Sequence, residues 1–142
     1  MSRWETTSTL EADVAPAAVW ERAYATAEAW PRWNTEIKRA HLDGPLTLGA
    51  KAKIVFGTGL RLRFHIVEFE EGWLFTDESR MPGARMGHRH LIESTEDGGS
   101  RLTNTIYIEG ALAPLWRRIM GPVAARTLPD AQRAAVELAR AN

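Results

Sequence analysis

Two histidines separated by one residue are the side chains of this sequence best suited to chemistry. They alternate with apolar residues, so an extended segment would place them on the same face as those residues. That face comprises Met86, His88, His90 and Ile92. Because its other members are apolar, we predict that it points into the protein interior. Two interior imidazoles can orient a ligand, transfer protons or bind a metal ion.

A metal site needs at least three ligands, and the sequence brings only these two histidines together. His65 follows Phe64 on another extended segment, so it is predicted to face solvent. Asp77 and Glu78 are adjacent, so one of these carboxylates can point inward, and the pattern does not decide which. An inward carboxylate such as Asp77 would form the best acid–base pair with the histidines. We therefore expect neither a metal ion nor a cofactor.

Asn104 is predicted to be a buried polar group, because it shares a strand face with Leu102 and Ile106. Its partner could be a ligand oxygen or a side chain of a neighbouring strand, and the pattern favours neither. The chain has no cysteine, phosphate-binding glycine loop, Gly-x-Ser-x-Gly elbow or His-Glu-x-x-His helix. None of its serines has an adjacent base. A covalent mechanism is therefore not expected.

The charge balance argues against a nucleic-acid partner. Lysine and arginine together number 18, as do aspartate and glutamate, so the formal net charge is zero. No apolar run approaches the roughly 20 residues of a membrane span, and the first residues lack the apolar centre of a signal peptide. We expect a cytoplasmic protein with one domain over residues 1–142.

The spacing of apolar residues differs between two parts of the chain. From Leu112 to Ala141, apolar residues recur every three or four positions, which predicts one long amphipathic helix, with Pro122 and Pro129 expected to kink it. Short helices are expected from Pro16 and around residues 30–34. Alternation between turn residues predicts seven strands, over residues 4–12, 37–42, 51–56, 60–70, 73–80, 84–95 and 100–109.

Seven strands are too many for one helix to cover. At about 4.8 Å per strand the sheet would be roughly 30 Å wide, whereas a helix is about 10 Å across. If the sheet curls around the helix, apolar surface that the helix does not reach would line a cavity. The residues predicted to line it are Trp30, Trp33, Phe64, Met81, Met86, His88, His90, Asn104, Ile106, Leu115, Trp116, Ile119, Met120 and Val123.

The order of elements and several short motifs resemble the START-like (SRPBCC) superfamily, in its bacterial polyketide cyclase/dehydrase-like branch. The motifs are Ala-Pro-Ala-Ala-Val-Trp at 15–20, Trp-Pro-Arg-Trp-Asn at 30–34, Gly44-Pro45-Leu46 with Gly49, Gly-Gly-Ser-Arg-Leu-Thr at 98–103, and Gly121-Pro122. The resemblance covers essentially the whole chain. It implies an α+β helix-grip fold, in which a curved seven-stranded antiparallel sheet wraps around a long C-terminal helix and two short helices follow the first strand.

The resemblance also implies that the partner is a small hydrophobic molecule of lipid, polyketide or aromatic type, held between sheet and helix. Three functions follow from it: a carrier or sensor, a cyclase or dehydratase that uses an inner histidine with a carboxylate or arginine, and a protein interaction module. A wholly apolar cavity would favour the carrier, and a convergent polar triad would favour the enzyme. An unpaired sheet edge leaves room for a homodimer.

Overall fold

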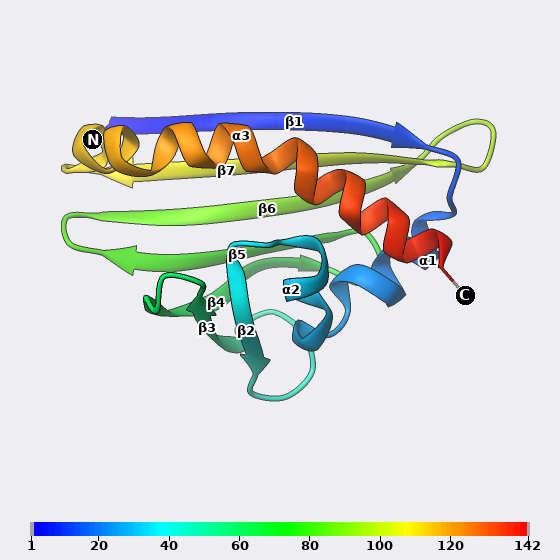
Figure 1. The fold of residues 1–142 in the computed structure, drawn as a ribbon, viewed down its shortest axis with the longest axis horizontal. Helices are drawn as coiled ribbons and strands as arrows, with labels where there is room; N and C mark the ends of the chain where they lie inside the picture. The colour runs from blue at the N-terminus through cyan, green and yellow to red at the C-terminus, as the bar shows by residue number, and fades with distance from the viewer. Residues whose placement is uncertain (1, 142) are drawn as a thin grey trace.

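A computed structural model describes residues 2–141 and contains one sheet, one long helix and a group of short helical segments (Figure 1). The first part of the chain comprises β1 (Ser2–Ala12), α1 (Pro16–Val19), η1 (Trp20–Tyr24), η2 (Ala27–Ala29) and α2 (Trp30–Trp33). The remainder comprises β2 (Ile37–Leu42), β3 (Lys51–Phe56), β4 (Arg61–Glu70), β5 (Leu74–Met81), β6 (Ala84–Ser94), β7 (Ser100–Gly110) and α3 (Ala113–Arg140).

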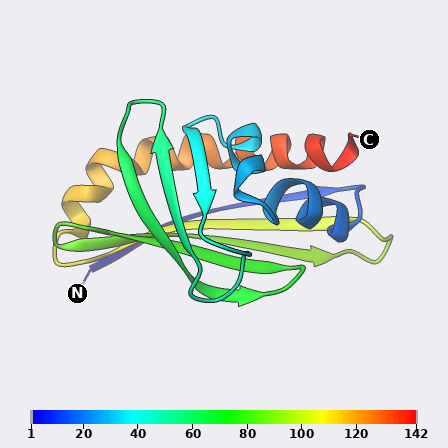
Figure 2. The ribbon, with the colours of Figure 1, turned by 90° about the horizontal axis from the view of Figure 1, so that it is seen from below.

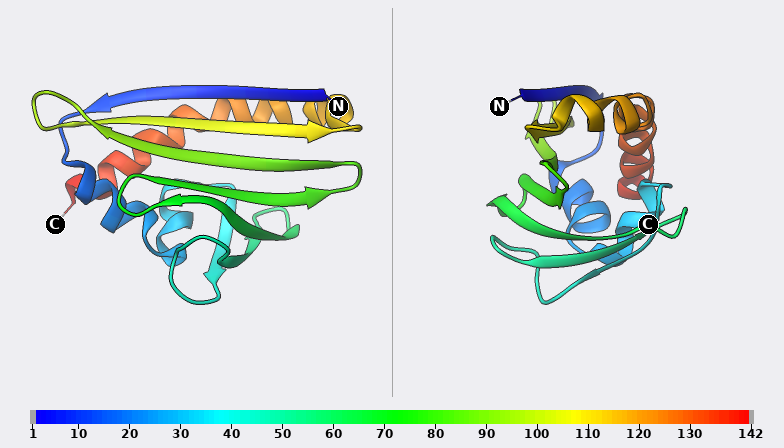
Figure 3. Two further views of the ribbon diagram at one scale, coloured as in Figure 1. Left: turned by 180° about the vertical axis from the view of Figure 1, so that it is seen from behind. Right: turned by 90° about the vertical axis from the view of Figure 1, so that its left-hand side faces the viewer.

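The seven strands form an antiparallel sheet in the order β1-β7-β6-β5-β4-β3-β2. Its edges are β1 and β2, which the sequence connects through the short helices. Register shifts in β2 and β4 mark bulges, which increase local twist. Figures 2 and 3 show the sheet curving, so that β2 to β4 turn toward the side on which α3 lies. The helix-grip fold expected from the sequence is confirmed.

Burial identifies the inner face of the sheet. On β7, Leu102, Asn104 and Ile108 are buried, and on β6, His90 and Ile92 are buried. The inward orientation predicted for the histidine strand is therefore confirmed. On β4, His65 lies in the outward set and is paired with Glu78 of β5, as its alternation with Phe64 predicts.

The entry helix is less regular than predicted. In place of one helix from Pro16, the chain forms α1, a π-helical segment and, after an extended Thr26, a 3₁₀ turn. The indole N–H groups of two tryptophans satisfy backbone carbonyl groups that this irregular segment leaves free. The indole Nε1 of Trp30 donates to Tyr24 O at 3.0 Å, and that of Trp33 donates to Ala23 O at 2.6 Å. Both rings are buried, so they wedge this segment against the sheet.

The long helix begins and ends within a residue of its predicted limits and contains Pro122 and Pro129 without interruption. Figure 1 shows it bending about halfway along its length, as the prolines predict. Gly121 lies against the Trp4 ring, which a larger side chain would push away. Among residues 2–141, no helix is both long and apolar enough to span a membrane.

Candidate functional site

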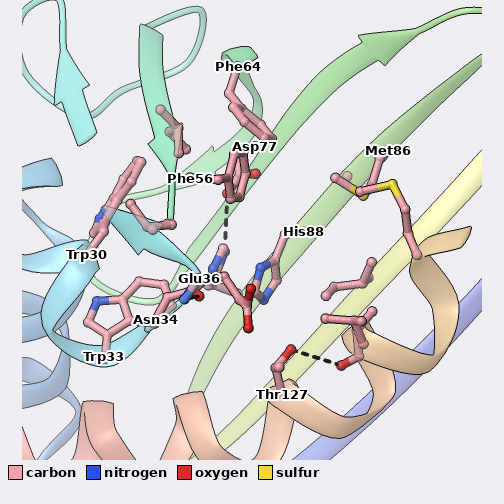
Figure 4. A pocket seen from close by; sticks show the side chains of 18 of the residues that line it. Trp30, Trp33, Asn34, Glu36, Phe56, Phe64, Asp77, Met86, His88 and Thr127 are labelled. Carbon is pink, nitrogen blue, oxygen red and sulfur yellow. Dashed lines mark hydrogen bonds and ion pairs between the residues drawn. The ribbon is translucent and has the colours of Figure 1, made fainter. Parts of the chain in front are cut away.

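A cavity of about 250 Å³ lies between the inner face of the sheet and α3. Figure 4 shows Trp30 and Trp33 at one end, Met86 at the other and His88 between them. The predicted residues that line it are Trp30, Trp33, Phe64, Met86, His88, His90, Ile106, Ile119, Met120 and Val123. Sequence reasoning did not propose Asn34, Glu36, Ile37, Ile54, Phe56, Phe75, Gly87, Ala124 or Thr127, which also line it.

Four residues predicted to line the cavity do not. Trp116 donates its indole hydrogen to Pro82 O at 2.8 Å, so it fixes the start of α3 to the β5–β6 turn. Leu115 is exposed, and Met81 lies at the end of β5, next to that turn. Asn104 lies behind the lining, where its amide faces His88. The helix therefore contributes residues 119–127, about one turn later than predicted.

Asp77 is the inward carboxylate, and it lies directly opposite His88 in the pairing of β5 with β6. One ligand atom of each of Asp77, His88 and His90 lies within 4.8 Å of the other two. The His88 and His90 rings are stacked, with 3.8 Å between their centroids and 23° between their planes. Glu78 points to the outer face, where it accepts a hydrogen bond from the Tyr107 hydroxyl. The structure thus brings together the polar triad that the sequence left undecided.

A relay of hydrogen bonds assigns the tautomer of His88. Gln132 of α3 donates from Nε2 to two backbone carbonyls, Ser8 O at 2.7 Å and Leu102 O at 3.2 Å, which fixes its amide orientation. The same nitrogen also donates to Asn104 Oδ1 at 2.8 Å, so one of its two hydrogens is shared between two acceptors. Asn104 therefore presents its NH₂ group to His88 Nε2, at 3.4 Å. His88 Nε2 is therefore an acceptor, and Nδ1 carries the hydrogen.

His90 is enclosed more completely. Its Nδ1 lies 3.3 Å from Phe75 O, which can only accept, so Nδ1 carries the hydrogen here also. Its Nε2 is buried and has no hydrogen-bond partner among the described residues. The Phe75 ring stacks on the imidazole at a centroid distance of 4.0 Å, and Tyr24 and Trp33 contact it edge to face. An unpaired buried acceptor of this kind is costly to maintain, which marks the position as functional or as a binding point for water.

Burial sets the protonation states of the triad. It raises the pKa of Asp77 to about 7 and lowers the pKa of His88 to about 3, because the charged forms lose their hydration. Burial also lowers the pKa of His90 well below its ordinary value, and the neighbouring imidazole adds to the effect. Asp77 Oδ2 and His90 Nδ1 are 3.9 Å apart. Since both pKa shifts favour the neutral forms, we interpret this contact as a neutral pair rather than an ion pair.

Two imidazoles and a carboxylate are a donor set that divalent transition metals bind. A metal ion lies close to the plane of each imidazole that binds it, about 2.0–2.1 Å from the nitrogen. Rings stacked at 3.8 Å cannot both direct a lone pair at one ion, and Asn104 already occupies His88 Nε2. The arrangement therefore suits hydrogen bonding and proton transfer, and it would have to open before it could hold a metal ion.

Solved structures with the same fold are distant in sequence. Truncated norcoclaurine synthase from Thalictrum flavum is 12% identical, with a TM-score of 0.76 over 99% of this chain and 96% of that one. A START superfamily protein from Mycobacterium smegmatis is 16% identical, with a TM-score of 0.70 over 94% and 97%. Ara h 8.0201 is 13% identical, with a TM-score of 0.72 over 96% and 98%. At these identities the likeness establishes the fold alone.

Sequence comparison identifies the family. No curated protein matches the chain in sequence. The sequence profile described as "Polyketide cyclase / dehydrase and lipid transport" matches residues 3–141, nearly the whole chain. This agrees with the seven-stranded sheet, the long C-terminal helix and the cavity between them. The chain therefore belongs to the polyketide cyclase/dehydrase and lipid transport family.

Proposed function

We propose that this protein binds a small, mainly apolar molecule that carries a hydrogen-bond acceptor such as a carbonyl oxygen. The observation that carries the proposal is His88, which lines the cavity with an Nδ1–H that has no acceptor among the described residues. The remaining wall is mainly aromatic and aliphatic. Apolar burial would supply the affinity, and the Nδ1–H of His88 would orient the ligand.

The cavity volume limits the size of the ligand. About 250 Å³ is below the roughly 300–1,000 Å³ of ordinary ligand pockets. We therefore propose a compact molecule of one or two rings, or a short chain, in preference to a lipid with two long acyl chains.

Calorimetric titration with two ligands of matched shape tests the donor. We expect 2-acetonaphthone, which has a carbonyl, to bind more tightly than 2-isopropenylnaphthalene, in which a CH₂ group replaces the carbonyl oxygen. One hydrogen bond is worth about 0.5–1.5 kcal/mol, so the preference should be roughly twofold to tenfold. His88→Leu removes the donor and should abolish the preference. Equal binding of both ligands by the unaltered protein would refute the role of His88.

A second candidate, acid–base catalysis on the bound molecule, is favoured by Asp77. Its raised pKa of about 7 lets this carboxyl group gain or lose a proton near neutrality, close to the carbonyl that His88 would hold. Asp77 carboxylate could remove a proton from the carbon next to that carbonyl, and His88 would stabilise the resulting enolate oxygen.

Proton exchange tests this candidate directly. In D₂O, the protein should accelerate replacement of the 2-acetonaphthone methyl hydrogens by deuterium, which NMR measures. Asp77→Asn should remove the acceleration and leave ligand binding in place. If hydrogen exchange with the unaltered protein is no faster than in buffer, acid–base catalysis is excluded and only the binding function remains.

A further inference from the structure

An apolar stripe on the first half of α3 is exposed beside the mouth of the cavity. Leu115, Ile119 and Val123 recur every four residues and are 51%, 58% and 38% exposed. Ile119 and Val123 also line the cavity, so the stripe forms one rim of its mouth. A row of exposed aliphatic side chains is typical of a surface that is covered during function.

The same segment is cationic. Between Gly110 and Pro129 the sequence contains Arg117, Arg118 and Arg126 and no aspartate or glutamate. At 3.6 residues per turn, Arg118 and Arg126 fall on the exposed face that carries the stripe. Among residues 2–141, no carboxylate forms an ion pair with any of the three arginines. Although the net charge of the protein is zero, the α3 side of the cavity mouth is therefore positively charged.

The opposite rim also exposes an aliphatic side chain. Phe56 lines the cavity, and the β3–β4 turn that follows it carries Leu60, which is 52% exposed. Figure 2 shows this turn reaching the same side of the molecule as the first half of α3. Both sides of the mouth thus expose aliphatic side chains, and the unpaired arginines lie on the α3 side.

We propose that this rim docks on the surface of a membrane that contains anionic lipid. The arginines would contact lipid phosphates while Leu115, Ile119 and Leu60 enter the boundary with the acyl chains. The mouth would then open toward the phase in which an apolar ligand dissolves. A second copy of the chain fits this surface less well, because a symmetric contact would place Arg118 and Arg126 against the same residues of the partner. The docking is independent of which ligand the cavity takes, so it can fail or succeed separately from the proposed binding.

Co-sedimentation with vesicles tests the proposal. The protein should bind vesicles that contain phosphatidylglycerol, should not bind vesicles of phosphatidylcholine alone, and should be released at high salt. Arg118→Glu with Arg126→Glu should lower the partition coefficient by at least about tenfold. Leu115→Ser with Ile119→Ser should lower it similarly. Circular dichroism should show that each double variant is folded.

Two matched controls locate the surface. Lys51→Glu with Lys53→Glu makes the same charge change on the outer face of β3, and Leu48→Ser removes a leucine that is 65% exposed in the β2–β3 loop. Both should bind vesicles as the unaltered protein does. The proposal is overturned if the controls weaken binding equally, or if the unaltered protein ignores anionic vesicles. It is also overturned if sedimentation velocity reveals a dimer that Leu115→Ser with Ile119→Ser abolishes while vesicle binding is absent.

Discussion

Gln132 of the long helix donates a hydrogen bond to Asn104 of β7 at 2.8 Å, and both side chains are buried. The same amide also accepts a hydrogen bond from the Ser8 hydroxyl at 2.7 Å, so it joins β1, β7 and α3. Because Asn104 in turn faces His88, the helix position and the histidine tautomer depend on one another. The relay is therefore both a structural tie and a means of positioning the site.

Gln132→Leu should lower the free energy of unfolding by about 2–4 kcal/mol, since it leaves several buried polar groups without a partner. Urea denaturation measures the change. Arg133→Leu, a neighbouring exposed position, is the control and should change stability by less than about 0.5 kcal/mol. Equal stabilities of the two variants would show that the relay contributes nothing to stability.

Gln132 also illustrates what the sequence could have revealed. It falls among the buried helix positions Leu128, Ala135, Val136 and Ala139, as Asn104 falls among apolar residues of its strand. A polar residue on an apolar face is the signal that identified Asn104, and the same reasoning applied to the helix would have selected Gln132. Its three partners lie at distant positions in the chain, so their identity required the structure.

Strand positions and the inward histidines were predictable because alternation over a long strand leaves one possible inner face. The choice between Asp77 and Glu78 was not predictable, since it depends on the register of β5 against β6. The part of α3 that lines the cavity was also predicted about one turn too early. The contacts that set its position, Trp116 with Pro82 and Gly121 with Trp4, join distant segments. Ligand binding, cytoplasmic location and dimerisation stay predictions.

Gly87→Ala should destabilise the fold, because an added Cβ would overlap the Tyr107 ring on the outer face of the sheet. We expect a loss of about 2 kcal/mol or more. Combining it with Tyr107→Ser should cost less than the sum of the two single changes, which a double-mutant cycle in urea detects. Gly57→Ala, where no heavy atom lies within 4 Å of the added Cβ, is the control. Additive costs would contradict this packing.

The triad predicts opposing effects of pH on stability. Burial lowers the pKa of His88 to about 3, so between pH 6.5 and 3 the unfolded chain binds the extra proton and acid destabilises the fold. His90 acts in the same direction. Burial raises the pKa of Asp77 from 3.8 to about 7, so across that range the folded chain binds the extra proton and acid stabilises the fold.

From pH 6.5 down to 4 the two histidines together outweigh the aspartate, so the net contribution of the triad to stability should fall. Asp77→Asn removes the opposing contribution, so the fall in stability should become steeper. His88→Gln with His90→Gln leaves only the contribution of Asp77, so the triad's contribution to stability should then rise as the pH falls. Urea denaturation over this pH range measures all three slopes, and identical slopes would exclude the assigned burial shifts.

The two halves of α3 should differ in amide hydrogen exchange. The first half exposes Leu115 and Ile119, whereas the second buries Val136 and Ala139. Pro122 and Pro129 each remove a backbone donor from the helix. Amides before Pro122 should therefore exchange faster than those after Pro129, by about tenfold or more, as mass spectrometry of peptide fragments reports. Uniform protection would contradict the weaker packing of the first half.

The binding role of the cavity is tested most directly by filling it. Thr127 of α3 lines the cavity, whereas Ala125 is exposed on another face of the same helix turn. Calorimetric titration with 2-acetonaphthone should show that Thr127→Phe weakens binding by at least about tenfold, the effect of losing roughly 1.4 kcal/mol of contact. Ala125→Phe should bind as the unaltered protein does. Unchanged binding by a folded Thr127→Phe variant would show that the ligand does not enter this cavity.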